Sequence, residues 1–139
     1  MSRTIAVVGA TGAVGRTMLD ILEKRSFPAD RLRLFASARS AGTTVDTAWG
    51  PVVVEDLAEA DPAGIDIALF SAGGDRSRAH AGRFVDAGAV VIDNSSAFRS
   101  DPEVPLVVAG VNDDAVREHK GLIANPNCST MTLMMAAGP

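Results

Sequence analysis

The chain has few of the residues that build disulfides and metal sites, and it has no long apolar run. Among 139 residues there are one cysteine and two histidines. One cysteine excludes an internal disulfide and favours a reducing, cytoplasmic setting. Without a Cys/His cluster we expect no metal, and no run approaches the roughly 20 residues that span a bilayer. The net charge of −4 gives no reason to expect nucleic acid or anionic membrane as partners.

Length and apolar pattern predict one α/β domain. The chain is long enough for one core and too short for two ordinary domains. Short apolar runs alternate with helical stretches, which is typical of a Rossmann-like, doubly wound, mostly parallel sheet with helices on both faces. We expect strands over 4–8, 32–36, 52–54, 65–70, 89–92, 106–108 and 121–124, and helices over 13–24, 75–87, 112–119 and from 128 onward.

Two of these helices carry apolar side chains at helical spacing. In the helix over 13–24 we expect one buried face, and the methionines after position 128 are more typical of core packing than of redox or metal chemistry. The residues concerned are Val14, Met18, Ile21 and Leu22 in the first helix, and Met131, Met134 and Met135 in the last.

A glycine-rich turn joins the first strand to the first helix. Its spacing is G-x-x-G-x-x-G over residues 9–15, a variant of the dinucleotide-binding pattern. Glycine permits close approach to a pyrophosphate, and the amides at the helix start would face the anion. The expected cofactor contacts are Thr11, Gly12, Ala13 and Val14. A plain structural corner is the alternative.

The end of the second strand favours NADP over NAD. An NAD site usually has an acid there for the ribose 2′-OH, but this strand runs into Ser37, Arg39 and Ser40. A guanidinium and two hydroxyls suit a 2′-phosphate, although a solvated loop arginine is the alternative. Ser71 ends another strand at the same sheet edge, where a small residue lets a nucleotide approach.

The single cysteine, Cys128, lies in Asn125-Pro126-Asn127-Cys128-Ser129-Thr130, where a strand turns into a helix. Amides and the helix dipole stabilise a thiolate at such a position, and a thiolate attacks acyl carbons. The alternative is a small buried hydrophobe.

Four separated segments resemble those of aspartate-semialdehyde dehydrogenases. They are the cysteine segment, the glycine turn, Ser37-Ala38-Arg39-Ser40-Ala41-Gly42 and Asp93-Asn94-Ser95-Ser96-Ala97-Phe98-Arg99. Together they cover nearly the whole chain in the family's order. The resemblance implies NADPH-dependent reductive dephosphorylation of 4-phospho-L-aspartate through a Cys128 thioester, within lysine, threonine and methionine biosynthesis. It also implies that Arg99 binds the substrate's phosphate.

The resemblance further implies a second domain that this chain does not contain. In the family that domain supplies the general base, the carboxylate-binding arginine and most of the contact of a homodimer or homotetramer. We therefore expect residues 1–139 to be the NADP-binding domain of a longer protein, and to be inactive without the rest. Two alternatives stay open, namely an N-acetyl-glutamyl-phosphate reductase-like enzyme and a non-catalytic NADP-binding module.

Overall fold

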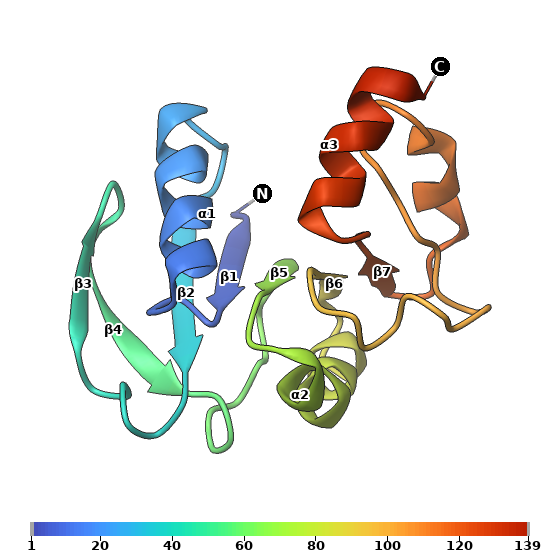
Figure 1. The fold of residues 1–139 in the computed structure, drawn as a ribbon. Helices are drawn as coiled ribbons and strands as arrows, with labels where there is room; N and C mark the ends of the chain where they lie inside the picture. Colours follow the sequence, from blue (N-terminus) through green and yellow to red (C-terminus); the bar gives the residue numbers. More distant parts are fainter. Residues whose placement is uncertain (1, 139) are drawn as a thin grey trace.

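The apolar runs form one seven-stranded sheet in residues 2–138, the part of the chain described by this computed structural model. Figure 1 shows the order of the elements along the chain. They are β1 (Thr4–Val8), α1 (Ala13–Lys24), β2 (Arg31–Ala36), β3 (Thr44–Thr47), β4 (Gly50–Asp56), β5 (Ile67–Phe70), α2 (Gly74–Asp86), β6 (Val90–Asp93), the 3-10 helix η1 (Asp113–Glu118), β7 (Leu122–Ala124) and α3 (Cys128–Ala137).

The sheet has the topology of a doubly wound fold. The strand order is β3-β4-β2-β1-β5-β6-β7, and every pair is parallel except the antiparallel β3–β4 hairpin. From β1 the chain first builds outward through β2, and it then returns to add β5 on the other side of β1. The switch point therefore lies at β1, and ligands of this architecture bind outside the carboxyl ends of the strands there. The predicted Rossmann-like class is confirmed.

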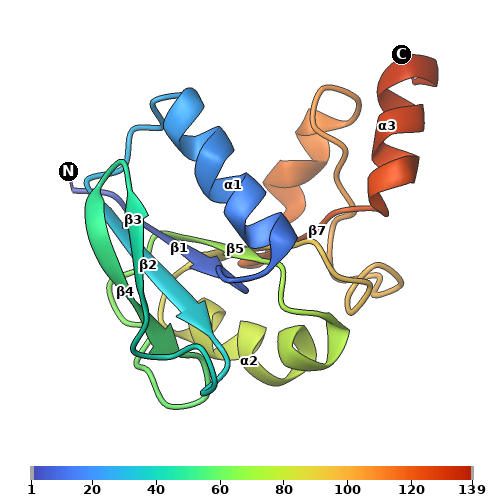
Figure 2. The ribbon, with the colours of Figure 1, turned by 60° about the vertical axis from the view of Figure 1, so that its left-hand side comes forward.

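Helices cover both faces of the sheet, with α1 on one side and α2 on the other (Figure 2). Successive residues of β1 pack in two different apolar clusters, one on each face of the sheet, because side chains of a strand alternate between faces. Ile5 and Val7 pack in the cluster that includes Leu19 and Leu22 of α1. Ala6 and Val8 pack in the cluster on the α2 side. In the α2-side cluster Phe84 meets Phe35 and Phe70 edge to face, with ring centroids 5.3 and 5.0 Å apart.

The buried face of α1 differs from the predicted one. Leu19 and Leu22 are buried, and Met18 packs at the edge of their cluster. Val14 and Ile21 are 48% and 45% exposed. The buried stripe follows the spacing i, i+4, i+7 from Gly15, so the helix is rotated relative to the prediction. That rotation follows from the close seating of Gly15 on the turn before it.

Three other predicted elements need correction, and one strand was missed. The hairpin strand β3 was missed because Thr44–Thr47 is polar and only half buried, and β4 runs over seven residues instead of three. The predicted strand over 106–108 makes only a single bridge, Leu106 to Ala124. The predicted helix over 112–119 is the 3-10 helix η1, which buries none of its residues.

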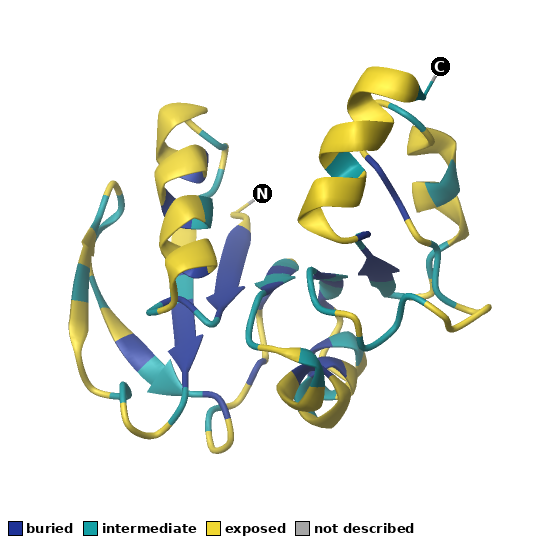
Figure 3. Cartoon of the chain, viewed as in Figure 1, coloured by how far each residue is buried: buried dark blue, intermediate teal, exposed yellow. Residues whose placement is uncertain are grey.

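The prediction that the methionines after Cys128 pack in the core is wrong for the described residues. Helix α3 has no buried residue and is coloured mostly as exposed in Figure 3. Leu133 and Met135 are 64% and 61% exposed. The helix lies at the end of the sheet on the side that carries α1 (Figure 2). No helix among the described residues combines the length and apolarity needed to cross a membrane.

Candidate active site

Two of the three glycines in the turn, Gly9 and Gly15, are sterically required, because any larger residue would clash with the backbone. Gly9 has φ +87°, and a Cβ there would lie 2.2 Å from the carbonyl oxygen of Ser71 at the end of β5. A Cβ on Gly15 would lie 2.2 Å from the carbonyl oxygen of Gly9. The absence of a Cβ at both positions lets the backbones of β1, the residue after β5 and the start of α1 approach closely. The turn therefore brings the first helical amides to the carboxyl edge of the sheet, where an anion would bind.

Gly12 is different, because the protein does not require glycine there. It is the N-cap of α1 with φ −78°, and a Cβ would meet nothing closer than the Gly9 carbonyl oxygen at 3.4 Å. Its amide donates to that oxygen at 3.1 Å. Glycine at position 12 leaves room for close approach of a ligand, as expected for a pyrophosphate-binding turn.

A cavity of about 240 Å³ opens beside this turn. Thr11 and Ser40, from separate loops, approach each other across it, with Oγ to Oγ 3.4 Å. Six of the eight predicted cofactor residues line the cavity, namely Thr11, Gly12, Ser37, Arg39, Ser40 and Ser71. Ala13 and Val14 lie in the first turn of α1 and are not among its lining residues. Three predicted segments, which follow β1, β2 and β5, thus converge on one concave site.

The cavity also contains residues that were not named as cofactor contacts. Gly9 belongs to the predicted glycine turn and Ala72 follows Ser71 at the predicted ligand-binding edge, whereas Ala36, Leu57 and Arg76 were missed. Ala36 and Leu57 are only 5% and 3% exposed, and they form an apolar part of the cavity wall. Arg76 is exposed in the first turn of α2. Its position just after the Gly73-Gly74 turn was the available signal, because that turn follows β5 at the ligand-binding edge of the sheet.

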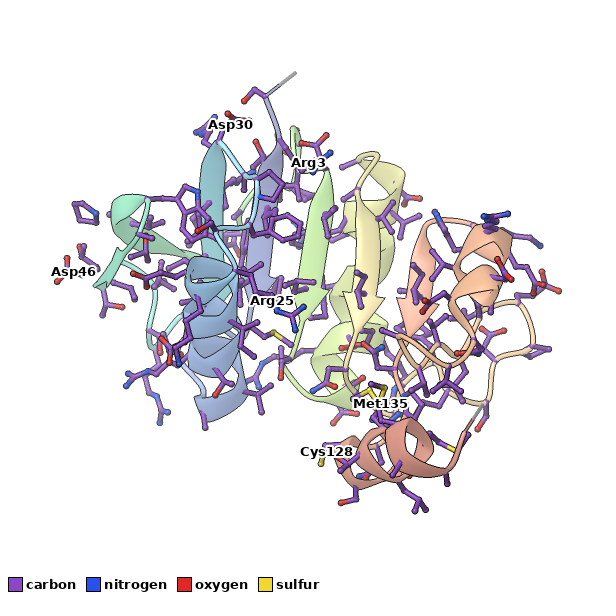
Figure 4. The ribbon with its side chains drawn as sticks, turned by 90° about the horizontal axis from the view of Figure 1, so that it is seen from above. Arg3, Arg25, Asp30, Asp46, Cys128 and Met135 are labelled. Atoms are coloured by element: carbon purple, nitrogen blue, oxygen red, sulfur yellow. The ribbon has the colours of Figure 1, made fainter. Side chains whose placement is uncertain are left out.

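Cys128 is exposed, which contradicts the alternative of a buried hydrophobe. It is the first residue of α3, and its sulfur projects from the helix on the side toward α1 (Figure 4). Asn127 caps the helix, since its Oδ1 accepts the Ser129 amide at 2.9 Å. The cysteine therefore sits at a capped helix N-terminus, the position predicted for a nucleophile.

Arg99 is tied to the cysteine turn through backbone groups. Its Nε donates to the Asn125 carbonyl at 2.7 Å, and its Nη2 donates to the Asn94 carbonyl at 3.1 Å. These carbonyls belong to the residues just after β7 and β6. Arg99 thus bridges the two loops that flank Cys128. Within the described residues Nη1 makes no hydrogen bond, so this end of the guanidinium is free for an anion.

Asp93, at the end of β6, connects helix α2 to the loop that contains Arg99. It is fully buried, and its two carboxylate oxygens accept from Ser77 Oγ and Ser95 Oγ, each at 2.6 Å. Ser77 lies on α2, whereas Ser95 begins the loop that leads to Arg99 and also accepts the Ala97 amide at 3.1 Å. The carboxylate therefore links the helix beside the cavity to the loop beside Cys128.

The cavity and Cys128 share one edge of the sheet. The glycine turn follows β1 and the cysteine follows β7, and both strands belong to the parallel set. Three strand spacings separate them, on the order of 14 Å at about 4.8 Å each. An extended dinucleotide anchored at the glycine turn can reach along that edge, which a mononucleotide cannot. Fold and site together define a Rossmann-like nucleotide-binding domain that carries an exposed cysteine.

Comparison with known proteins places this domain in a family. The family model described as "Semialdehyde dehydrogenase, NAD binding domain" matches residues 4–119. The chain belongs to that family. The class of cofactor is therefore a nicotinamide dinucleotide, in agreement with the geometry of the cavity.

The relatives are named aspartate-semialdehyde dehydrogenases. One from Streptomyces akiyoshiensis is 57% identical over 97% of this chain and 39% of its own length. One from Bacillus subtilis is 52% identical over 97% of this chain and 39% of its own length. The chain thus spans about two fifths of these relatives.

Solved structures agree. Aspartate semialdehyde dehydrogenase II of Vibrio cholerae, complexed with ASA, has a TM-score of 0.95 and 48% identity, covering 100% of this chain and 46% of that one. The Candida albicans enzyme with NADP has a TM-score of 0.76 and 28% identity, covering 95% and 44%.

Proposed function

We propose that residues 1–139 are the NADP-binding domain of an aspartate-semialdehyde dehydrogenase, which a second domain completes in the whole protein. The reaction is the NADPH-dependent reductive dephosphorylation of 4-phospho-L-aspartate to L-aspartate 4-semialdehyde. One observation carries the proposal. The single cysteine is exposed at the start of α3, on the sheet edge that also carries the dinucleotide cavity.

The chemistry assigned to this chain centres on the Cys128 sulfur. The sulfur attacks the acyl carbon of the substrate, a C–S bond forms, and the C–O bond to the phosphate breaks. Phosphate leaves with the bonding electrons, so the product is a thioester on Cys128. Sulfur suits this sequence because it is both a good nucleophile and a good leaving group. NADPH, held by the residues that line the cavity, would supply the hydride to the thioester carbon; the C–S bond would then break, with its electrons returning to the sulfur of Cys128 as the semialdehyde leaves.

Arg99 is assigned to the substrate's phosphate. Two of its N–H groups are held by the Asn94 and Asn125 carbonyls, which orients the planar guanidinium. Its Nη1 group has no hydrogen-bond partner among the described residues, and the guanidinium carries a permanent positive charge. A preoriented fork of this kind binds a phosphoryl group with little further loss of side-chain freedom.

The choice of NADP rests on the loop after β2. Ser37, Arg39 and Ser40 line the cavity, and no Asp or Glu does so within the described residues. Arg39 is exposed and pairs with no carboxylate in that part of the chain. A ribose 2′-phosphate would find a cation and hydroxyls, whereas the acid that usually holds a free 2′-OH is missing.

The proposal extends to the setting of the enzyme. The small-molecule partners are the acyl phosphate, the semialdehyde and phosphate. We place the reaction in lysine, threonine and methionine biosynthesis in the cytoplasm, with the whole protein a homodimer or homotetramer built mainly by the second domain.

The test is phosphate-dependent NADP reduction with aspartate semialdehyde, measured on the full-length protein. Cys128→Ala should lower kcat by roughly 10³ or more, as for loss of a nucleophile, while NADP still binds. Ser129→Ala, one residue away in the same turn, is the matched control and should keep most of the activity. A Cys128→Ala enzyme with more than a tenth of normal kcat would contradict the assignment.

Two further assays on the same full-length protein distinguish the proposed function from its two alternatives. Activity confined to N-acetyl-glutamate semialdehyde would favour the acyl-phosphate reductase alternative. A non-catalytic module would show slow iodoacetamide labelling of Cys128 at neutral pH, insensitive to substrate, whereas the proposed nucleophile should label fast and be protected. We expect the 139-residue chain without its second domain to turn over nothing measurable.

A further inference from the structure

Arg76 and Arg39 both line the dinucleotide cavity, and they follow strands on opposite sides of β1 in the sheet. Arg76 comes from the first turn of α2, whereas Arg39 comes from the loop after β2. Both side chains are exposed, and neither pairs with a carboxylate among residues 2–138. On a chain of net charge −4, two unpaired guanidiniums at one cavity mark a place for an anionic or π-rich ligand.

Two other arginines, Arg33 of β2 and Arg83 of α2, have close polar partners. Arg33 is held by Glu55 through two hydrogen bonds at 2.8 and 2.6 Å, and it also donates to two carbonyls. Arg83 donates to the carbonyls of Leu57 and Ala58 at 3.1 Å and of Ala60 at 2.7 Å. Arg76 has only a long contact, Nη1 to the Ala72 carbonyl at 3.4 Å. Among residues 2–138 its guanidinium is therefore exposed and not fixed by a close polar partner.

The wall beside Arg76 is apolar and rigid. Ala36 and Leu57 are nearly fully buried and line the cavity. Arg83 belongs to the same helix as Arg76, and its bonds to the 57–60 turn fix Leu57 relative to α2. The space between Leu57 and Arg76 is thus set by one helix. An apolar surface and a planar cation that line one cavity are suited to receive an aromatic ring.

We propose that Arg76 covers the adenine ring of the cofactor, with Ala36 and Leu57 against the ring's other face. Arg39, with Ser37 and Ser40, is left to the 2′-phosphate. The chain already holds an arginine in this relation to a ring, since the Arg33 guanidinium carbon lies 5.0 Å from the Phe35 centroid. Arg76 then contributes equally to NADP and NAD, because both carry adenine. This inference rests on the proposed cofactor site.

Calorimetry on the full-length protein tests the assignment with 2′,5′-ADP, 5′-AMP, NADP and NAD as ligands. Arg76→Ala should weaken all four by about the same factor, fivefold to tenfold for a stacked guanidinium. Arg76→Lys keeps the positive charge but replaces the planar guanidinium, and it should lose most of the affinity that Arg76→Ala loses. Arg39→Ala should weaken only 2′,5′-ADP and NADP. Nicotinamide mononucleotide, which lacks adenine, should be insensitive to Arg76→Ala.

Arg78→Ala is the matched control. Arg78 lies two residues farther along α2, pairs with Asp75 at 2.6 Å and is not among the cavity-lining residues, so its loss should leave all affinities unchanged. If Arg76→Ala changes nothing, or weakens only the 2′-phosphorylated ligands, the adenine assignment is wrong. If the unmodified protein binds none of the four ligands, the cofactor site itself is wrong. Arg76 is exposed, and circular dichroism of each variant verifies that the fold persists.

Discussion

Gly15→Ala should destabilise the protein although alanine is the better helix former. A Cβ at position 15 would lie 2.2 Å from the Gly9 carbonyl oxygen and 2.8 Å from the Ala10 Cα. Both are backbone atoms of the cofactor turn, so no flexible side chain can move aside. Overpacking of this kind costs about 3 kcal/mol, and the gain in helix propensity returns about 1 kcal/mol. A net loss of about 2 kcal/mol in unfolding free energy is expected.

Gly82→Ala is the matched control for this change. Gly82 is also inside a helix, and a Cβ there would meet nothing within 4 Å. It should stabilise the fold by about 1 kcal/mol. Thermal unfolding followed by circular dichroism should place the two variants on opposite sides of the parent. At about 4 °C per kcal/mol, Tm should fall by about 8 °C for Gly15→Ala and rise by about 4 °C for Gly82→Ala.

Cofactor affinity provides the second measurement. Because the added methyl pushes on the Gly9 carbonyl, Gly15→Ala should displace the turn and weaken NADP binding, whereas Gly82→Ala should not. Two variants with equal Tm shifts, or a Gly15→Ala protein with unchanged stability, would refute the claim that α1 is seated on the turn by backbone contact.

Three further predictions follow from single contacts. Asp93→Ala should lower the free energy of unfolding in urea by about 3 kcal/mol, because it removes two hydrogen bonds to a buried carboxylate. Asp93→Asn should lower it clearly less, since an amide can still form a hydrogen bond with each of the two serine hydroxyls. Equal losses in the two variants would show that the charge itself is needed. Burial and then the nearby Arg83 lower the pKa of His80, so its NMR titration midpoint should lie below the usual range and rise in Arg83→Gln. The stability contributed by the neutral imidazole should be fully present above the ordinary histidine pKa and should decline as the pH falls from that value through the lowered pKa. A midpoint that the substitution does not move would remove Arg83 as a cause. Asn127→Ala removes the cap of α3 and should cost about 1 kcal/mol locally, visible as faster amide hydrogen exchange confined to α3, whereas exchange that accelerates throughout the sheet would contradict a local role.

Much of the local structure could be predicted because it depends on short patterns. The run over residues 4–8 and the helix over 13–24 have the predicted bounds, since a buried strand flanked by a glycine turn is recognisable from neighbours in sequence. The hairpin strand β3 was missed because its residues are polar and half exposed. Its pairing depends on β4, not on its own periodicity.

The amino-acid order alone was enough to indicate the Rossmann-like class, the glycine turn and a cysteine at the helix start after the last strand, because backbone freedom at glycine and the two hydrophobic periods are local properties. Tertiary structure decided what those features become together. The order of the strands brings the loops after β1, β2 and β5 to one cavity, and it adds Leu57 and Arg76, which no spacing singled out. It also decided that α1 turns Leu19 inward and Val14 outward, and that the apolar α3 stays uncovered by the described residues. These outcomes depend on which surfaces meet across long stretches of chain, and a local pattern carries no information about that.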